Sequence, residues 1–298
     1  MTVTSKDGIK RTRGDKAASV RKLTDLPTLP GILIKIWKLA ESPDTSSKDL
    51  EKVISLDQTL TAKVIRLANS PFYFSSSHVN NVQDAIVNIG MKTVRSLAAA
   101  VSISSVFKKS RTANKNYFPL KDFWRHCIGV GVTSGYLAGI VDGIDRDFMF
   151  CAGILHDIGK FALNILFPDK FGEALQIASS ERCSITAAER KVLDTDHAHF
   201  GEKLAQYWNL GDDLSGILGN HHRALSEVDE MLRIETALLK IADSIVREIR
   251  FGFPGDFLGG EFDPASMELL DLSTEKIEQH KDGVNRQIEK AAELVDLI

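Results

Sequence analysis

The chain has 298 residues, 43% of them hydrophobic, and a formal net charge of −3 at pH 7. This length and apolar content can bury one large core, or one core with a smaller satellite. The charge excludes a general attraction to nucleic acid or anionic lipid, which needs clustered Lys and Arg against phosphates. A basic patch at residues 10–22 is short, and residues 1–20 are predicted to form a solvated, flexible leader.

The cysteines and the distribution of apolar residues indicate a cytoplasmic location. Cys127, Cys151 and Cys183 are odd in number, far apart and set in apolar or helical contexts, which is typical of reduced thiols. The N-terminus lacks the apolar core of a signal peptide, and we find no run of about 18 to 20 apolar residues. We therefore predict a cytoplasmic protein without a membrane span.

Helical periodicity dominates residues 21–108, which we predict to form an N-terminal helical lobe. From Asp57 to Asn69, apolar residues recur at helical spacing, with Asp57 as the predicted N-cap. Gly90 separates two of the later helices. The other helices predicted here span Lys48–Ser55, Val82–Ile89 and Met91–Phe107.

The helices at Lys48–Ser55 and Asp57–Asn69 together resemble a helix-turn-helix in outline. The second of them carries few side chains that could read bases, and the charge balance is wrong for DNA. Two packed helices of an orthogonal bundle are therefore favoured, and a DNA-binding regulator is the weakest of the functions we consider.

A polar stretch, Lys108–Asn116, marks the predicted boundary to a second helical lobe at residues 117–250. Strand signals are nearly absent, so we predict an all-α fold, a multi-helix orthogonal bundle. Residues 251–298 are predicted to be a loop followed by a helix, capped by Ser273 or Thr274, that packs on the core. The main helices predicted in the second lobe begin near Asp122 and span Arg146–Leu155 and Leu193–Trp208.

Imidazole and carboxylate side chains recur in one order along the second lobe. Successive helices of a bundle can deliver such side chains to a common point, which is how helical proteins build metal sites. These ligand types suit Fe, Mn, Zn or Ni, and a shared Asp can bridge two ions, so we predict one or two ions per chain. Any one His is more often structural, but the ordered set favours a shared site. The predicted ligands are His126, His156, Asp157, His197, His221, His222 and Asp243.

The adjacent pair His156 and Asp157 sets a geometric condition. Neighbouring helical residues point about 100° apart, so both can reach one site only near a helix end or with the metal between their directions. Gly153 and Gly159 bracket the pair and leave room for close helix approach. Lys160 is predicted to sit at the rim, as a point charge suited to phosphate.

These segments resemble a known family. FWRHC, ILHDIGK, DHAHFGEKLAQYW, NHHRA and IADSIV resemble the successive signatures of the HD superfamily of metal-dependent phosphohydrolases. The front half resembles an HDOD domain in LPTLPGILIKIWKLAESP, ISLDQTLTAKVIRLANSPFYF and NVQDAIVNIGMKTVRSL. The resemblance covers residues 21–250 and implies an HDOD-type lobe at 21–108 followed by an HD-like lobe at 117–250.

The ligand order is also similar to that of HD-GYP phosphodiesterases, which hydrolyse cyclic dinucleotides. That resemblance implies that all seven predicted side chains are ligands, with Asp157 as the bridging carboxylate and Lys160 near the substrate phosphate. Asp122, four residues before His126, matches an extra carboxylate ligand of some of these enzymes. The Gly-Tyr-Pro element is missing, because the chain continues from its His pair as HHRALSEVDE.

Two functions remain open at this point. HDOD domains are regarded as regulatory modules of bacterial signalling, which implies a signal-transduction module with an HD-type, dinuclear site and a signalling protein as partner. The complete ligand order favours the alternative, a metal-dependent phosphohydrolase or phosphodiesterase acting on a nucleotide or another phosphoester. Its predicted catalytic residues are Asp157, Lys160 and His221, or His222 as the acid if that residue is left unligated.

Overall fold

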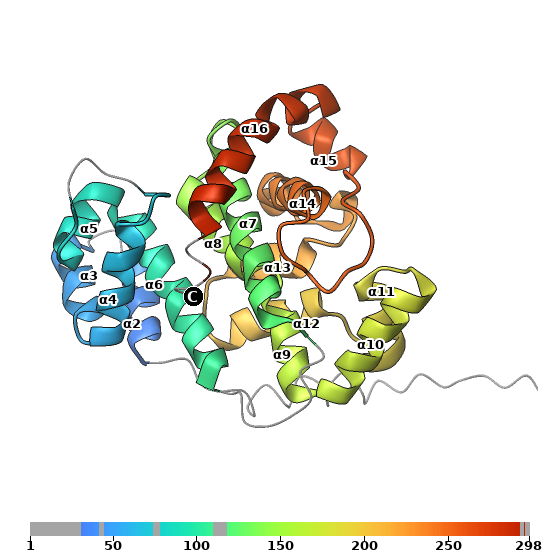
Figure 1. Cartoon of the computed structure of the whole chain (residues 1–298), viewed down its shortest axis with the longest axis horizontal. Coiled ribbons are helices and arrows are strands. Elements are labelled where there is room, and N and C mark those ends of the chain that lie inside the picture. The colour runs from blue at the N-terminus through green and yellow to red at the C-terminus, as the bar shows by residue number, and fades with distance from the viewer. Residues whose placement is uncertain (1–30, 42–44, 74–77, 110–117, 293–294, 296–298) are drawn as a thin grey trace, which may run out of the picture.

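The computed structural model describes residues 31–41, 45–73, 78–109, 118–292 and 295, and these contain helices and no strand. The all-α prediction is confirmed. The leader predicted at 1–20 and the boundary at 110–117 lie outside the described residues, and the division into domains stays a prediction. The front lobe (Figure 1) consists of α2 (Gly31–Glu41), α3 (Ser47–Ile54), α4 (Gln58–Ala68), α5 (Val82–Ile89) and α6 (Met91–Lys109).

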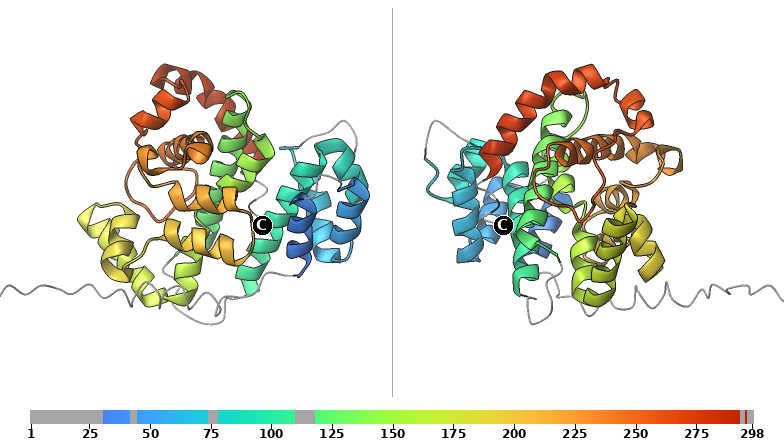
Figure 2. Two further views of the ribbon diagram at one scale, coloured as in Figure 1. Left: turned by 180° about the vertical axis from the view of Figure 1, so that it is seen from behind. Right: turned by 45° about the vertical axis from the view of Figure 1, so that its right-hand side comes forward.

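The rest of the chain builds a larger lobe beside the front lobe, as the two views of Figure 2 also show. Its order is α7 (Leu120–Ala138), α8 (Arg146–Leu155), α9 (Ile158–Leu166), α10 (Pro168–Glu181), α11 (Ile185–Leu193), α12 (His197–Tyr207), α13 (Asp212–Asn220) and α14 (Arg233–Glu248). The short helix α15 (Pro264–Leu269) and the long helix α16 (Thr274–Ala291) follow.

Local signals explain where the front helices begin and end. The Asp57 carboxylate accepts a hydrogen bond from the Leu60 backbone N–H at 3.0 Å, which satisfies an otherwise unpaired donor at the start of α4. Gly90 ends α5 with φ of 87°, a left-handed conformation that glycine adopts without steric cost. The inner face of α4 is buried against α5 and α6, as expected for a bundle helix.

Helix α8 lies at the centre and contacts α6, α7, α13 and α14. It crosses α7 where two glycines meet, and a Cβ on Gly153 would lie 2.6 Å from the Gly131 Cα. A larger residue at either position would force these two helices apart. The crossing therefore fixes the end of α8 against the middle of α7, which carries His126.

The front lobe is joined to α8 through polar and aromatic contacts. Lys92 forms an ion pair with Asp145 at 2.6 Å, and the Thr93 hydroxyl lies 2.7 Å from the Asp147 carboxylate. Rings from the loop after α4 pack against Phe150 of α8. The start of α8 thus contacts the front lobe, and its end lies in the interior of the larger lobe.

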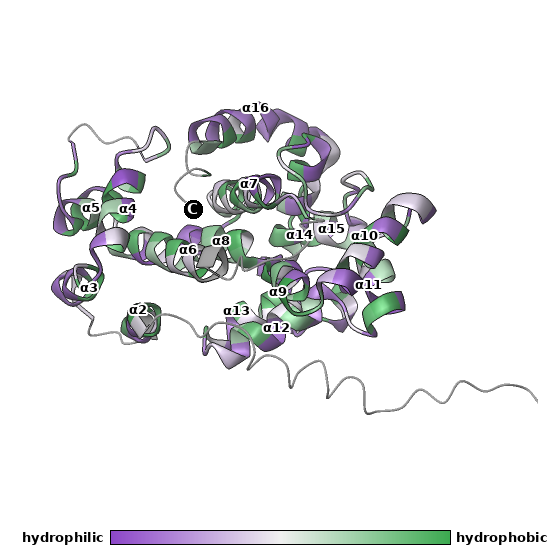
Figure 3. Ribbon diagram, turned by 60° about the horizontal axis from the view of Figure 1, so that its bottom comes forward, coloured by the Kyte–Doolittle hydropathy of each residue, from purple (hydrophilic) through white to green (hydrophobic). Residues whose placement is uncertain are grey.

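Helix α16 packs on α7 and buries Ile277, Val284 and Ile288, while its outer side is largely hydrophilic (Figure 3). Ser273 caps its start by accepting from the Lys276 backbone N–H at 3.2 Å.

One expected boundary needs correction. The helix predicted at Leu193–Trp208 begins at His197 instead, because Leu193 ends α11, Asp194 takes a left-handed conformation and Asp196 caps α12.

Residues Arg146–Leu166 are long and apolar enough to resemble a membrane span. Of their most apolar window, 83% is buried inside the protein, as a core segment requires.

Candidate metal centre

The pair His156 and Asp157 lies at the junction of α8 and α9. His156 is the C-cap of α8, and Asp157 occupies the N-cap position of α9 without making a capping hydrogen bond. The Asp157 carboxylate therefore remains available for other contacts. Gly159 then packs directly against the backbone of His197 at the start of α12, where any side chain would collide with the carbonyl oxygen. This close approach brings His197 to Asp157.

All seven side chains of the predicted series converge on the ends of these helices. His126 comes from the middle of α7, His197 begins α12, His221 is the C-cap of α13, and Asp243 lies on α14. Six of the seven are at most 8% exposed, and His222 is partly buried. All of these residues except Asp243 form two groups of close ligand atoms that share Asp157, and Asp243 lies beside the second group.

The first group, here called the histidine-rich half, faces Asp157 Oδ1. His197 Nε2 lies 3.2 Å and His221 Nε2 3.6 Å from that oxygen. His222 Nε2 lies 3.0 Å from His197 Nε2. Two nitrogens held at right angles, each about 2.1 Å from one ion, would also be about 3.0 Å apart, so this spacing suits two ligands of a common ion.

The second group, the carboxylate-rich half, faces Asp157 Oδ2. His156 Nε2 lies 3.3 Å and His126 Nε2 3.9 Å from that oxygen. Asp243 Oδ1 completes the group at 3.0 Å from His126 Nε2 and 3.9 Å from His156 Nε2. One carboxylate thus presents a different oxygen to each half, which is the arrangement of a bridging ligand.

Hydrogen bonds fix which nitrogen of each ring points inward. Nδ1 of His156 lies 2.7 Å from the Gly153 carbonyl, and Nδ1 of His221 lies 2.7 Å from the Leu218 carbonyl. A carbonyl oxygen only accepts, so each Nδ1 must carry the proton. In the neutral ring Nε2 then keeps a lone pair, and in both residues that atom faces Asp157.

Several inward atoms lack a hydrogen-bond partner among the described residues although they are fully buried. They include Asp157 Oδ1, Asp243 Oδ1, His221 Nε2 and His126 Nε2. Unpaired buried polar atoms are costly, and folded proteins rarely tolerate several together. Acceptor atoms gathered around one point instead fit cations, so the residues present are suited to hold metal ions.

Burial and charge shift the pKa values of the carboxylates. Burial alone would raise the pKa of Asp157, but the neighbouring charges of His156 and Lys160 hold it well below its usual range. Burial would likewise raise the pKa of Asp243, and contact with His126 instead lowers it strongly. Both acids are therefore ionised at neutral pH, as ligands must be.

The same environment shifts the pKa values of the imidazoles in different directions. Burial lowers the pKa of His221 to about 4 and also lowers the pKa values of His126 and His222, which keeps these rings neutral. Burial would lower the pKa of His197 too, but the charge of Glu189 raises it to about 9. His197 is thus the imidazole at which a cation must compete with a proton.

Two polar residues discussed from the sequence lie elsewhere than expected. Lys160 is buried instead of lying at the rim, and its Nζ is 2.6 Å from Asp157 Oδ2, because it follows in the first turn of α9. Asp122 is exposed and belongs to neither half in the described structure. A further histidine, His199 of α12, faces outward and contacts Glu202.

Two residues that the sequence analysis did not single out support the centre. Glu189 Oε2 accepts hydrogen bonds from both the backbone N–H and the ring Nδ1 of His197, at 2.9 and 2.7 Å. Arg247 lies 3.6 Å from Asp243 Oδ2 and 3.2 Å from Asp256. Arg247 follows Asp243 by one helical turn, a spacing that could have revealed it. Glu189 has no such signal, because the turn at Asp194 brings it to His197.

Comparison with known proteins agrees with this architecture. Residues 26–224 match the HDOD domain family. A crystal structure of an HDOD domain protein from Geobacter sulfurreducens is 23% identical, with a TM-score of 0.79 over 93% of this chain and 97% of that one. A candidate signal transduction protein from Marinobacter aquaeolei VT8 is 20% identical, with a TM-score of 0.78 over 96% of this chain and 65% of that one.

Two further relatives are more distant or longer. A candidate metal-dependent phosphohydrolase from Shewanella amazonensis SB2B is 20% identical, with a TM-score of 0.63 over 93% of this chain and 96% of that one. An uncharacterized protein of Treponema pallidum (strain Nichols) is 24% identical over 69% of this chain, which spans only 39% of that protein's length.

The fold and the buried His and Asp cluster define an all-helical protein with a candidate metal centre. The chain belongs to the HDOD domain family, whose model matches two thirds of its length.

Proposed function

We propose that this chain is a signal-transduction module whose larger lobe binds two transition-metal ions. The observation that carries the proposal is the placement of Asp157, whose two oxygens face separate groups of imidazoles in a buried, hydrogen-bonded setting. The proposed ligands are His197, His221 and His222 on one side, His126, His156 and Asp243 on the other, and Asp157 between them.

The types of ligand atom in the two halves limit which metals can bind. Neutral imidazole and carboxylate suit Fe, Mn, Zn or Ni, whereas sites of oxygen atoms alone would suit Mg or Ca. Neither half includes a cysteine: Cys127 and Cys151 are buried, and burial raises the pKa of both thiols. A site for soft metals held by thiolate is therefore not favoured.

The signalling role is supported by how α8 connects the molecule. Its first turn contacts the front lobe through Asp147, and its last residue leads into His156. Metal binding at the centre would therefore stabilise the position of α8, the same helix that the front lobe contacts. A signalling protein that docks on the front lobe is the partner we propose, in line with the description of the Marinobacter protein.

Phosphoester hydrolysis at the same centre is the second candidate. It is favoured by the complete ligand set and by the partial exposure of His222 and of the Asp243 side chain, 12% exposed, which marks the side that reaches solvent. Bound ions would supply positive charge to a phosphoryl group under attack. If His222 is left unligated in that reaction, it is better placed than the buried His221 to give a proton to a leaving alkoxide.

Lys160 would serve this reaction by its charge. Its ammonium keeps Asp157 ionised in the buried site and would add positive charge beside a phosphoryl oxygen. The Shewanella protein, named as a candidate metal-dependent phosphohydrolase, has this fold but does not by itself assign the activity to this chain.

Elemental analysis with a phosphoester screen tests both candidates. We expect about two transition-metal ions per chain after purification or reconstitution. Metal-loaded protein that turns over no nucleotide, cyclic nucleotide or cyclic dinucleotide would leave the signalling role, and turnover that stops with a chelator would establish the hydrolase. Protein that binds no metal even on reconstitution would refute the centre itself.

A further inference from the structure

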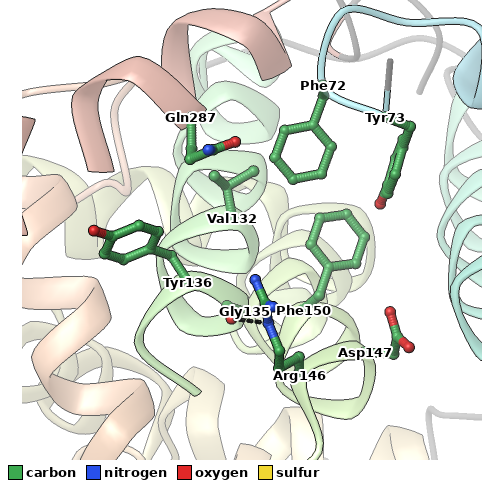
Figure 4. A pocket seen from close by; sticks show the side chains of 9 residues that line it. All are labelled: Phe72, Tyr73, Val132, Gly135, Tyr136, Arg146, Asp147, Phe150 and Gln287. Atoms are coloured by element: carbon green, nitrogen blue, oxygen red, sulfur yellow. Dashed lines mark hydrogen bonds between the residues drawn. The ribbon is translucent and has the colours of Figure 1, made fainter. Parts of the chain in front are cut away.

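A cavity of about 440 Å³ lies where the two lobes and α16 meet, apart from the metal centre (Figure 4). That volume is within the range of small-molecule sites, which favour such junctions. None of its lining residues belongs to the seven proposed ligands. The lining consists of Phe72, Tyr73, Val132, Gly135, Tyr136, Arg146, Asp147, Phe150 and Gln287.

One side of the cavity is a wall of aromatic rings from both lobes. Phe72 and Tyr73 follow α4, and Phe150 lies on α8, with ring centroids 4.6 Å apart for the first two and 6.1 Å apart for Phe72 and Phe150. Figure 4 shows the three rings grouped around one end of the space. Phe72 is nearly parallel to Phe150, and Tyr73 stands nearly perpendicular to both, so the wall can contact a planar ring by face or by edge.

Hydrogen-bonding groups lie around the aromatic wall, as Figure 4 shows for Arg146, Asp147 and Gln287. Arg146 uses its Nε to donate to the Gly135 carbonyl at 3.3 Å, and its guanidinium has four more N–H donors. The side chain is exposed, so a ligand can reach these donors. Gln287 of α16 adds an amide, and Asp147, held through its contact with Thr93, adds an acceptor.

We infer that this cavity is a nucleotide-binding site, with the base against the rings and the phosphate on Arg146. Stacking on aromatic faces and bidentate contact with guanidinium are the two interactions that a base and a phosphate make best. A lipid tail fits less well, because Val132 is the one aliphatic side chain among the described lining residues. The donors and acceptors of Arg146, Asp147 and Gln287 would have no partner on such a tail.

The site is distinct from the metal centre but lies on the same helix. Phe150 precedes His156 by six residues, which is about 9 Å along α8. A nucleotide could also reach the metal centre, so the experiment must separate the two sites. The inference does not depend on the proposed metals, because the cavity is built by other residues.

Calorimetric titration of the full chain with AMP and GMP tests the inference, with adenosine and ribose 5-phosphate as probes of each half of the ligand. We expect one nucleotide per chain, and binding about tenfold weaker or more for each partial probe. Binding should persist in excess EDTA. Phe72→Ala and Arg146→Gln should each weaken it about tenfold, with Gln287→Ala as a third variant on an independent helix.

Matched controls are Phe257→Ala, an exposed ring outside the cavity, and Arg286→Gln, the exposed residue beside Gln287 on α16. Both should bind like the unchanged chain, and circular dichroism should show that all variants are folded. No binding of either nucleotide at millimolar concentration would overturn the inference. Binding that EDTA abolishes, or that the three cavity variants leave unchanged, would place the nucleotide at the metal centre and overturn it equally.

Discussion

The two halves of the candidate metal centre share Asp157 but are supported by opposite charges. In the histidine-rich half, the buried Glu189 carboxylate holds His197 by two hydrogen bonds. In the carboxylate-rich half, the flanking groups are cations: Arg247 lies beside Asp243, and Lys160 lies on Asp157 Oδ2.

This difference indicates unequal affinities. An anion behind an imidazole strengthens it as a ligand, and the hydrogen bond and the charge act in the same direction. A cation beside a ligand repels the incoming ion, and Lys160 occupies the very oxygen that the second ion needs. We therefore expect the histidine-rich half to fill first and hold its ion longer.

The largest effect should come from Asp157, which belongs to both halves. Asp157→Ala should remove both ions and abolish any phosphoesterase activity, measured by elemental analysis and by the substrate screen. It also leaves the buried Lys160 unpaired, which costs about 3 to 5 kcal/mol of stability, so Asp157→Asn is the companion variant that fills the space.

Asp263→Asn provides the control for Asp157. Asp263 also pairs with a lysine, Lys240 at 2.9 Å, but lies outside both halves. It should keep its metal content. Full metal content in folded Asp157→Ala or Asp157→Asn would show that the bridging role is wrong.

The sequence predicted several helix ends and close helix approaches because the relevant signals are local. Asp57, Ser273 and Gly90 mark helix ends through hydrogen bonds or backbone conformations that involve near neighbours only. Gly153 and Gly159 anticipated close helix approach, which the structure contains at α7 and at α12. The convergence of the seven side chains followed from their order and residue type.

Features that depend on tertiary contacts were missed or misplaced. The contact between Glu189 and His197 depends on the left-handed turn at Asp194, the same turn that divides the helix predicted at Leu193–Trp208. Lys160 was expected at the rim: its spacing of three residues from Asp157 indicates the contact between them, but its burial depends on the elements packed around α9. The cavity between the lobes is likewise formed by segments far apart in the chain.

A pair of histidine variants should separate the halves. His221→Ala should remove the ion of the histidine-rich half and leave the other, while His126→Ala should do the reverse, because only Asp157 is common to both. Each variant should retain about one ion per chain by elemental analysis. Anomalous scattering from crystals of each would locate the remaining ion. Loss of both ions in either variant would mean that the halves are not independent.

A smaller effect is expected from Glu189→Gln, which keeps the shape of the side chain and removes its charge. Affinity of the histidine-rich half should fall about 10- to 100-fold, measured by competition with a coloured chelator. Glu202→Gln is the matched control, since Glu202 contacts the outward-facing His199 instead of a proposed ligand. An unchanged affinity in Glu189→Gln would mean that this carboxylate serves the fold alone.

The smallest effect on metal binding should come from Arg247→Gln. The contact of Arg247 with Asp243 is 3.6 Å, too long for a hydrogen bond, so positioning by Arg247 is weaker than positioning by Glu189. Its positive charge also opposes the bound ion, and loss of that repulsion offsets the loss of positioning. We expect the metal affinity of the carboxylate-rich half to change by less than about tenfold in the chelator assay.

Arg247→Gln should lower the stability of the protein more clearly than it changes metal affinity. Arg247 also pairs with the buried Asp256 at 3.2 Å and donates to the Leu258 carbonyl at 3.1 Å, so Arg247→Gln should destabilise the loop after α14 by about 1 to 3 kcal/mol in denaturant unfolding. A gain of more than tenfold in affinity would show that repulsion governs the carboxylate-rich half. A loss as large as that of Glu189→Gln would show that positioning governs both halves, and the contrast between an anionic and a cationic support would fail.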